Sequence, residues 1–280
     1  MNAPLPPLVP AAAQLAALEA VLRSMGEVAV AVSGGVDSLT LAAVAYRALE
    51  NRASMFHAVS PAVPAEATDR TRKLADREGW ALTVLDAGEF GSSDYMNNPV
   101  DRCFYCKTSL YGAIRPHTMA QMVSGTNLDD LGEYRPGLIA AKEHGVRHPF
   151  VEARIDKQGV RRISRYLGLG DVAELPASPC LSSRIETGIA IDPVMLDCVH
   201  RSERLMDREL TPKTVRCRVR AGGVVIELDE ASLASLTDEW RASLTNQLRA
   251  LFERAGFAFD VKFAPYRVGS AFLHFKRPEK

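Results

Sequence analysis

The stretch Val28-Ala29-Val30-Ala31-Val32-Ser33-Gly34-Gly35-Val36-Asp37-Ser38 joins an apolar run, a pair of glycines and the start of a helical pattern. The apolar run at 28–32 has the length of a buried strand, and residues 37–50 follow a helical pattern. Glycines between a strand and a helix let main-chain N–H groups approach an anion closely. The segment therefore predicts a phosphate-binding loop, and we expect it to bind ATP.

The side chains of this loop support the same interpretation. Ser33 and Ser38 offer hydroxyl groups, and Asp37 is placed to hold the Mg²⁺ that accompanies a polyphosphate. The helix that begins near Asp37 adds unpaired N–H groups and the positive end of its dipole. The alternative is a glycine turn that only joins strand to helix, but the two serines and the aspartate argue against it. The loop also lacks the lysine of the common P-loop and the GxGxxG spacing of dinucleotide-binding folds.

Length and composition limit the classes of protein. The 280 residues suit one large domain or two smaller ones, and the 34 acidic and 34 basic side chains provide no general attraction for nucleic acid. No apolar run approaches the about 20 residues that span a bilayer. The Pro/Ala-rich start lacks the basic residues of a signal peptide, so we expect a cytoplasmic protein whose five cysteines are reduced.

Short apolar segments alternate with helical patterns over the first two thirds of the chain. The expected strands are 28–32, 55–60, 81–85, 121–124 and 146–150, and the expected helices are 11–25, 37–50, 64–78, 106–116, 136–144 and 157–168. This alternation predicts an α/β fold with a doubly wound parallel sheet covered by helices on both faces. Ligands of such folds bind at the carboxyl ends of the strands, where the Ser33 loop lies.

The pattern changes beyond about residue 190. A helix at 193–210, strands at 214–219 and 224–228, a mostly helical stretch at 231–255 and a third strand at 257–263 are expected there. Gly222 and Gly223 mark the hairpin turn. The expected organisation is a flexible N-terminus at 1–10, an α/β domain at 11–185, and a small α+β domain for substrate binding or oligomerisation at 190–280.

Three cysteines lie in polar surroundings. Cys103 and Cys106 form a C-x-x-C where a loop enters a helix, and Cys180 lies in the turn-rich segment PCLSSR, in which Arg184 would favour the thiolate. Three thiolates can hold three irons of a [4Fe–4S] cluster and leave the fourth iron open. A zinc half-site, a redox pair or chance reduced thiols are the alternatives, but a zinc site would need further Cys or His ligands nearby.

The predicted strand at 214–219 has two distinct faces. Cys217 alternates with valines on the inner face and reads as a packing residue, as does Cys198 on the preceding helix. The opposite face carries Arg216, Arg218 and Arg220. These arginines either form a solvated face with partners such as Glu227 across the hairpin, or clamp a phosphate.

A second polar segment, at 124–130, follows the predicted strand at 121–124. Gly125 would let a ring or phosphate approach, and Asp129 or Asp130 could complete a magnesium site. Such polar clusters are also ordinary turns. The remaining candidates for contacts with ATP are Ser60, Gly125 and Asn127.

The SGGVDS loop resembles that of the N-type ATP pyrophosphatases, the PP-loop superfamily. Together with EYRPGL at 133–138, PCLSSR at 179–184, the helix around Glu203 and TVRCRVR at 214–220, it makes nearly the whole chain similar to the LarE family of sulfur transferases. The resemblance implies that ATP adenylates a carboxylate of pyridinium-3,5-biscarboxylic acid mononucleotide and releases pyrophosphate. Sulfur then displaces AMP, which gives a thiocarboxylate for the nickel-pincer nucleotide of lactate racemase.

The resemblance also implies roles for single residues. Asp37 would act through magnesium, Arg216 and Arg218 would hold the phosphate of the substrate, and Glu203 would contact the substrate or its pyridinium ring. By itself, Glu203 would be interpreted as part of a solvated salt bridge.

Two routes for sulfur stay open. In single-cysteine LarE proteins the cysteine that matches Cys180 gives up its own sulfur. Three-cysteine members resemble cluster enzymes, which implies a [4Fe–4S] cluster on Cys103, Cys106 and Cys180 that passes on a sulfide. The family further implies a ring-like homo-oligomer with possible contacts to other nickel-pincer assembly proteins.

Three other functions compete with this one. A tRNA-thiolating PP-loop enzyme shares the adenylation step but predicts a basic surface, against which the neutral charge balance argues. An amide-forming ligase similar to NAD synthetase predicts ammonia-dependent AMP formation. A non-catalytic cluster sensor that binds ATP predicts no release of pyrophosphate.

Overall fold

The computed structural model describes residues 10–132 and 135–271, and these form two compact units. The first unit contains the described chain up to Val59, together with Ala65–Gly88 and Cys103–Ser178. The second contains Ser60–Pro64, Glu89–Arg102 and the described chain from Pro179. The sequence predicted contiguous domains, whereas both units are built from several separate segments.

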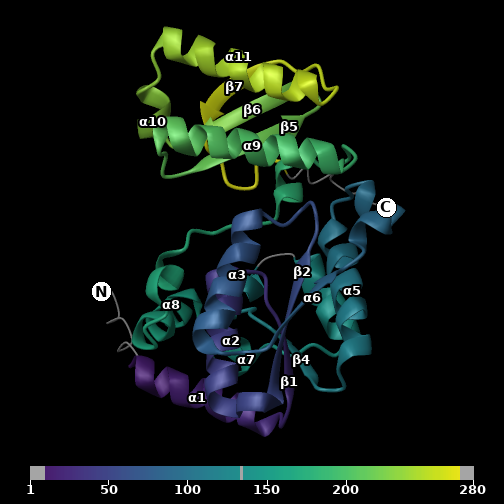
Figure 1. The fold of residues 1–280 in the computed structure, drawn as a ribbon, viewed down its shortest axis with the longest axis vertical. Helices are drawn as coiled ribbons and strands as arrows, with labels where there is room; N and C mark the ends of the chain where they lie inside the picture. Colours follow the sequence, from purple (N-terminus) through teal and green to yellow (C-terminus); the bar gives the residue numbers. More distant parts are fainter. Residues whose placement is uncertain (1–9, 133–134, 272–280) are drawn as a thin grey trace, which may run out of the picture. The chain divides into compact units, whose positions relative to one another are not determined.

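The first unit contains a four-stranded parallel sheet (Figure 1). Its strands are β1 (Val28–Ala31), β2 (Ala53–Val59), β3 (Leu82–Asp86) and β4 (Gln121–Ser124), in the order β3-β2-β1-β4. The chain adds strands in one direction from β1 to β3 and then returns to place β4 on the other side of β1. The order thus reverses between β1 and β4, which is where α/β folds usually bind their ligands.

Helices cover both faces of this sheet. They are α1 (Ala11–Ser24), α2 (Val36–Leu49), α3 (Ala65–Glu78), α5 (Arg102–Ile114), α6 (Pro136–Glu143), α7 (Pro149–Glu152) and α8 (Lys157–Tyr166). Side chains of α1, α2, α3 and α8 pack with Val28 and Val30 of β1, whereas side chains of α5 and α6 pack with Ala29 and Ala31. Both faces of β1 are therefore buried, as predicted for a doubly wound parallel sheet.

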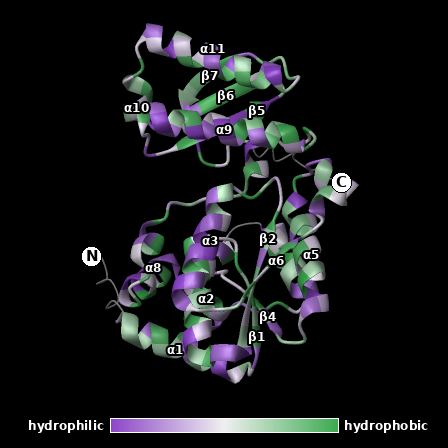
Figure 2. Ribbon diagram, in the orientation of Figure 1, coloured by the Kyte–Doolittle hydropathy of each residue, from purple (hydrophilic) through white to green (hydrophobic). Residues whose placement is uncertain are grey.

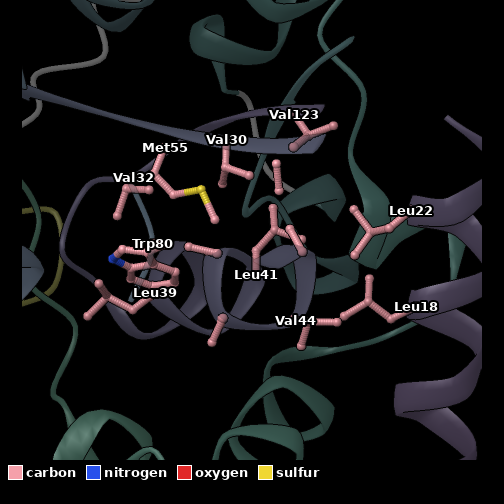
Figure 3. Packing of buried hydrophobic residues seen from close by; sticks show 14 of the residues in the cluster. Leu18, Leu22, Val30, Val32, Leu39, Leu41, Val44, Met55, Trp80 and Val123 are labelled. Atoms are coloured by element: carbon pink, nitrogen blue, oxygen red, sulfur yellow. The ribbon is translucent and has the colours of Figure 1, made fainter. Parts of the chain in front are cut away.

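The larger hydrophobic core lies between the sheet and helices α1, α2 and α8. Figure 3 shows Leu41 of α2 pointing toward Val30 and Val123 of the sheet, and Val44 pointing toward Leu18 of α1. All five side chains are at most 1% exposed. This packing fixes α2, and with it the loop that precedes the helix.

The prediction of a strand at 146–150 is wrong. In this segment Arg147 forms a single parallel bridge with Val123, and α7 begins at Pro149. Proline has no N–H to give to a sheet but fits the first turn of a helix, where that N–H would be unpaired. The predicted strand is thus replaced by a bridge followed by a helical turn.

The second unit is a small α+β domain, as predicted. It contains α4 (Ser93–Met96), α9 (Pro193–Leu210), β5 (Val215–Arg220), β6 (Gly223–Leu228), α10 (Glu230–Ala234), α11 (Asp238–Arg254) and β7 (Val261–Pro265). Strand β6 pairs antiparallel with β5 and parallel with β7. Figure 2 shows this central strand mainly in green, for hydrophobic residues, drawn between α11 and α9, which also carry polar residues.

The segment Glu89–Arg102 belongs to the second unit through buried polar contacts. The Tyr95 hydroxyl is 2.6 Å from Ser182 Oγ, and the Asn98 amide donates to the carbonyls of Glu186 and Ile189, both at 2.9 Å. Arg102 Nη1 in turn donates to Asn98 Oδ1 at 2.9 Å. These bonds attach the segment to the residues that follow Cys180.

Short 3-10 helices complete the described structure, at Glu50–Arg52, Glu89–Gly91, Arg115–His117, Leu128–Gly132, Gly170–Glu174 and Leu181–Arg184. Among the described helices, none combines the length and apolar character needed to cross a membrane.

Candidate active site

The loop before α2 is shaped by glycine geometry and by one serine. Gly34 has φ +79°, and a Cβ at this position would lie 2.6 Å from the Ala67 carbonyl oxygen. Ser38 Oγ donates to the Gly35 carbonyl at 3.1 Å and accepts the Ser33 N–H at 3.0 Å. The Ser38 hydroxyl thus holds the loop in shape.

Gly125 lies directly against the first turn of α2. A Cβ on Gly125 would lie 2.8 Å from the Ser38 nitrogen and 2.9 Å from the carbonyl carbon of Asp37. The sequence predicts that a ring or a phosphate approaches Gly125, but the backbone of α2 occupies this space. The missing side chain therefore allows the carboxyl end of β4 to contact the phosphate-loop helix.

The Asp37 carboxylate is held by two residues from distant parts of the chain. Asn127 Nδ2 donates to Asp37 Oδ1 at 3.1 Å, and Lys157 Nζ lies 2.5 Å from Asp37 Oδ2. The Asp37 side chain is 24% exposed. Because a carboxylate has about four acceptor positions, the two remaining ones suit a hard cation such as Mg²⁺.

Asp129 and Asp130, the other magnesium candidates, each accept a hydrogen bond from a backbone N–H. Asp129 Oδ2 accepts the Lys157 N–H at 3.3 Å, and Asp130 Oδ2 accepts the Asn127 N–H at 3.0 Å. They thereby place Asn127 and Lys157, the two residues that hold Asp37. Sequence reasoning missed Lys157, because one lysine at a helix start 120 residues from its partner carries no recognisable pattern.

Arg70 of α3 is a second cation at the loop that the sequence analysis missed. Its Nη1 donates to the Gly34 carbonyl at 2.5 Å. Burial lowers the pKa of this guanidinium from its ordinary value, against the opposite influence of Glu66. Arg70 and Lys157 thus bring two positive charges to a loop whose N–H groups suit phosphates.

The C-x-x-C cysteines lie in the first two turns of α5. Cys103 is exposed and Cys106 partly buried, and their spacing of three places both on one face of the helix. A Cβ on Gly137 of α6 would lie 3.2 Å from Lys107 Cγ and 3.6 Å from the Cys103 carbonyl oxygen. Gly137 therefore lets α6 pack closely on the cysteine helix, while Glu133 and Tyr134 of the same motif lie outside the described residues.

Arg184 shapes the backbone around Cys180 in the second unit. Its Nη1 donates to the carbonyls of Pro179 at 2.6 Å and Cys180 at 3.1 Å. Nε and Nη2 bind Glu203 Oε1 and Oε2 at 2.9 and 3.0 Å. The sequence analysis expected Arg184 to favour the Cys180 thiolate, but its N–H groups bind these carbonyls and the Glu203 carboxylate.

Glu203 is buried, so the interpretation as a solvated salt bridge is wrong. The residue is 8% exposed, and Oε1 also accepts the Cys217 N–H at 3.0 Å. Helix α9 packs on β5 and turns this carboxylate inward. Glu203 thus connects the Cys180 loop, through Arg184, to the strand of the three arginines.

The arginines of β5 have different partners. Arg218 and Arg220 bind the two oxygens of Glu227, at 3.1 and 2.7 Å. Glu227 is the partner that the structural alternative named, but the Arg218–Glu227 pair is buried and not solvated. Arg218 also donates to the Ser183 carbonyl at 3.0 Å. The Arg216 guanidinium lies 5.9 Å from the centre of the Tyr266 ring, and burial together with the nearby Arg184 lowers the pKa of Arg216.

Ser60, Cys198 and Cys217 each have a structural role within the second unit. Ser60 follows β2 in the chain but belongs to the second unit, where its Oγ accepts the Ala62 N–H at 3.3 Å. Cys198 and Cys217 are 1% and 0% exposed, which confirms them as packing residues. Burial raises the pKa of both thiols and keeps them neutral.

The candidate residues are divided between the two units. The phosphate loop, Cys103 and Cys106 belong to the first, and Cys180, Glu203 and the β5 arginines belong to the second. Within the described part of each unit, no three Cys, His, Asp or Glu side chains gather as a possible metal site.

No protein-family model matches the chain. It is 31% identical over 230 residues to the pyridinium-3,5-bisthiocarboxylic acid mononucleotide synthase of Lactiplantibacillus plantarum, with 79% of this chain and 82% of that protein covered. This chain belongs to the LarE family. Two further relatives resemble this LarE-family chain and are uncharacterized. They are slr1717 of Synechocystis sp., 37% identical with 82% and 85% covered, and MJ0830 of Methanocaldococcus jannaschii, 25% identical with 73% and 78% covered.

Proposed function

We propose that this chain is an ATP-dependent sulfur transferase of nickel-pincer cofactor synthesis and a member of the PP-loop superfamily. It would adenylate the carboxylates of pyridinium-3,5-biscarboxylic acid mononucleotide and convert them to thiocarboxylates for the cofactor of lactate racemase. The observation that carries the proposal is the phosphate loop at the β1/β4 switch, in a chain related to a synthase of the bisthiocarboxylic product. A carboxylate becomes an acyl donor only when its oxygen can leave, and adenylation supplies that leaving group.

The first unit would perform the adenylation. The loop N–H groups and the start of α2 would bind the phosphates of ATP, with Arg70 and Lys157 contributing positive charge. Asp37 would hold Mg²⁺, which when bound stabilises the charge that develops on pyrophosphate. Lys157 and Asn127 would orient the Asp37 carboxylate.

Sulfur transfer would depend on Cys103, Cys106 and Cys180. The first two share one face of α5, and thiolates are the ligands that iron–sulfur clusters prefer. We therefore propose that the three thiols hold a [4Fe–4S] cluster, which when bound supplies the sulfide. Sacrificial transfer of the Cys180 sulfur is the alternative outcome of the test below.

Substrate binding would use the β5 face. Arg216 and Arg218 would hold the substrate phosphate, and Glu203 would contact the substrate or, through Arg184, place the groups around it. Arg218 also binds Glu227 and the Ser183 carbonyl, so its role would be partly structural. We also propose a homo-oligomer, which light scattering on the purified protein would test, with possible contacts to other nickel-pincer assembly proteins.

The test is to reconstitute the protein without oxygen, measure iron and acid-labile sulfide, and follow pyrophosphate and thiocarboxylate with the proposed substrate. We expect about four irons and four sulfides per chain, and substrate-dependent release of pyrophosphate. Cys180→Ala should abolish thiocarboxylate formation but retain pyrophosphate release, whereas the buried control Cys198→Ala should retain both. Normal thiolation by Cys180→Ala would contradict the assigned sulfur site.

Other outcomes would support other functions. An ATP-binding protein without iron, in which Cys180 loses hydrogen sulfide during turnover, would establish the sacrificial route. Stimulation of ATP turnover by tRNA would favour tRNA thiolation. Ammonia-dependent AMP formation that survives replacement of all three cysteines would indicate an amide-forming ligase.

A further inference from the structure

A groove between α9 and α11 is lined by positive charge. Its volume is about 470 Å³, and the charged residues that line it are all arginines: Arg201, Arg204, Arg208 and Arg254. The buried side chains of Leu205 and Leu251 provide its apolar part. The groove lies entirely within the second unit and involves none of the residues assigned above to ATP, sulfur or substrate.

Helical spacing brings the arginines together. Arg201, Arg204 and Arg208 are separated by three and four residues, so they lie on one face of α9. Glu203 lies on a different face of this helix, where it binds Arg184. Arg254 comes from α11, which packs on α9 at the contact of Cys198 Sγ with the Leu251 carbonyl, 4.0 Å apart.

Nearby carboxylates offset only part of this charge. Asp197 lies 3.5 Å from Arg201, and Asp207 lies 3.9 Å from Arg204. Among the residues that the structure describes, no carboxylate forms an ion pair with Arg208 or Arg254 within 4.0 Å. Arg208 and Arg254 therefore contribute positive charge that no ion pair among the described residues offsets.

A favourable interaction with the helix dipole explains the positions of only two of these arginines. Arg208 and Arg254 lie in the last turns of their helices, where a positive charge is favourable. Arg201 and Arg204 lie further from the end of α9, beyond the turn in which the dipole acts. The helix dipole therefore does not explain why Arg201 and Arg204 line the same groove as Arg208 and Arg254.

We propose that this arginine groove binds a diphosphate group, either free pyrophosphate or the diphosphate of a nucleotide. Guanidinium groups bind phosphate oxygens through two parallel hydrogen bonds, and two adjacent phosphates offer several such oxygens to arginines from both helices. The volume lies within the range of about 300–1,000 Å³ that is usual for small-molecule sites. Leu205 and Leu251 would contact the less polar part of a nucleotide.

The test uses phenylglyoxal, which modifies accessible arginines, on the full chain at low ionic strength, with mass spectrometry of each arginine. Pyrophosphate and ATP should each protect Arg208 and Arg254 but leave Arg23 on α1 reactive. In titration calorimetry with pyrophosphate, R208Q/R254Q should weaken one binding event about tenfold or more. The control R23Q/R249Q removes the same charge outside the groove and should leave that event unchanged.

The site-specific readout separates this proposal from the nucleotide loop of the first unit. Asp37→Ala should leave protection of Arg208 and Arg254 intact even if it abolishes adenylation. Absence of protection by both pyrophosphate and ATP would overturn the proposal. So would protection by a single-stranded RNA oligonucleotide alone, because that result would assign the groove to a nucleic-acid backbone.

Discussion

Arg184 and Glu203 form a two-point ion pair inside the second unit, with side chains only 4% and 10% exposed. The same arginine binds the carbonyl of Cys180, and the same glutamate accepts the N–H of Cys217. A single pair therefore fixes both the loop of the proposed sulfur donor and the strand of the proposed phosphate ligands.

Arg184→Met should strongly destabilise the protein, because it leaves the Glu203 carboxylate buried without its partner. Loss of one member of a buried pair costs about 3–5 kcal/mol. Urea unfolding should show the loss, while R165M, which removes an exposed pair with Glu174, should unfold close to wild type. The double variant R184M/E203L should recover part of the stability, and equal instability of single and double variants would argue against this account.

Gly125→Ala should reduce ATP affinity by about tenfold or more. Its Cβ would lie 2.8 Å from the Ser38 nitrogen, so α2 or β4 must shift, at a cost of about 1–3 kcal/mol. Calorimetric titration with a non-hydrolysable ATP analogue measures the affinity. Gly112→Ala is the control because nothing lies within 4 Å of its Cβ, and equal affinities of the two variants would mean that the contact is unimportant.

Lys157→Met should impair adenylation with little effect on stability. The pair with Asp37 is partly solvated, and such pairs contribute about 0–1 kcal/mol. The loss of charge and of carboxylate orientation should instead appear in substrate-dependent pyrophosphate release. Lys142→Met, on the exposed side of α6, provides the control. Full activity of K157M with a lowered melting temperature would instead assign Lys157 a role in stability and none in adenylation.

Arg216→Gln and Arg218→Gln should behave differently. We expect R216Q to raise KM for the nucleotide substrate about tenfold or more, as for loss of a charged hydrogen bond. R218Q should destabilise the protein by about 1–3 kcal/mol, because Glu227 loses a buried partner. Steady-state kinetics together with thermal melts separates the two effects. An unchanged KM in R216Q would mean that the arginines of β5 have a structural role and do not bind the substrate phosphate.

The buried imidazole of His57 should make the stability of the first unit decrease in mild acid, because unfolding allows His57 to take up a proton. Its Nδ1 lies 2.8 Å from the Val32 carbonyl and must donate to it, while Nε2, 2.9 Å from Thr68 Oγ1, accepts the hydroxyl proton. Desolvation by burial lowers the pKa of His57 below its ordinary value of 6.5, against the smaller opposing influence of the Val32 bond. The unfolded chain therefore binds the proton first, so stability is full above about pH 6.5 and falls below it.

Urea midpoints between pH 5 and 8 measure this dependence. His57→Gln should flatten the slope below pH 6.5, whereas the exposed His117→Gln should keep it. A remaining slope is expected from His148, whose pKa is also lowered by burial. The same slope in wild type and H57Q would show that His57 does not titrate on unfolding.

The strand, glycine turn and helix of residues 28–49 could be predicted from the sequence because their determinants are local. The apolar run before Ser33, the glycines and the helical pattern after Asp37 are contiguous, and each constrains its own backbone. The glycines of the β5–β6 hairpin are also a local signal. Gly223 has φ +115°, and a Cβ at this position would lie 2.6 Å from the Asp260 carbonyl oxygen. The prediction of a strand at 146–150 was wrong because it gave more weight to the apolar residues of this segment than to Pro149, which is a local signal for the start of a helix.

The contacts around these elements could not be predicted, because they depend on residues far apart in the chain. Lys157 is recognised as a partner of Asp37 only when α8 and α2 pack together. Glu203 looked solvated because its neighbours on α9 are charged, yet its own helix face is buried against β5. Charge patterns reveal which residues share a helix face, but tertiary packing decides which face is buried.

The attachment of Tyr95 and Asn98 to residues beyond Cys180 has a consequence for synthesis. Tyr95 leaves the ribosome 87 residues ahead of Ser182, so the bond between their hydroxyls forms only after the later residues of the first unit have been made. A fragment that ends at Ser178 would lack the Ser182 hydroxyl and the carbonyls to which Asn98 donates. No single cut in the gene would therefore yield these two units as separate pieces, and the second unit can finish folding only after the residues that follow Ser178 have been made.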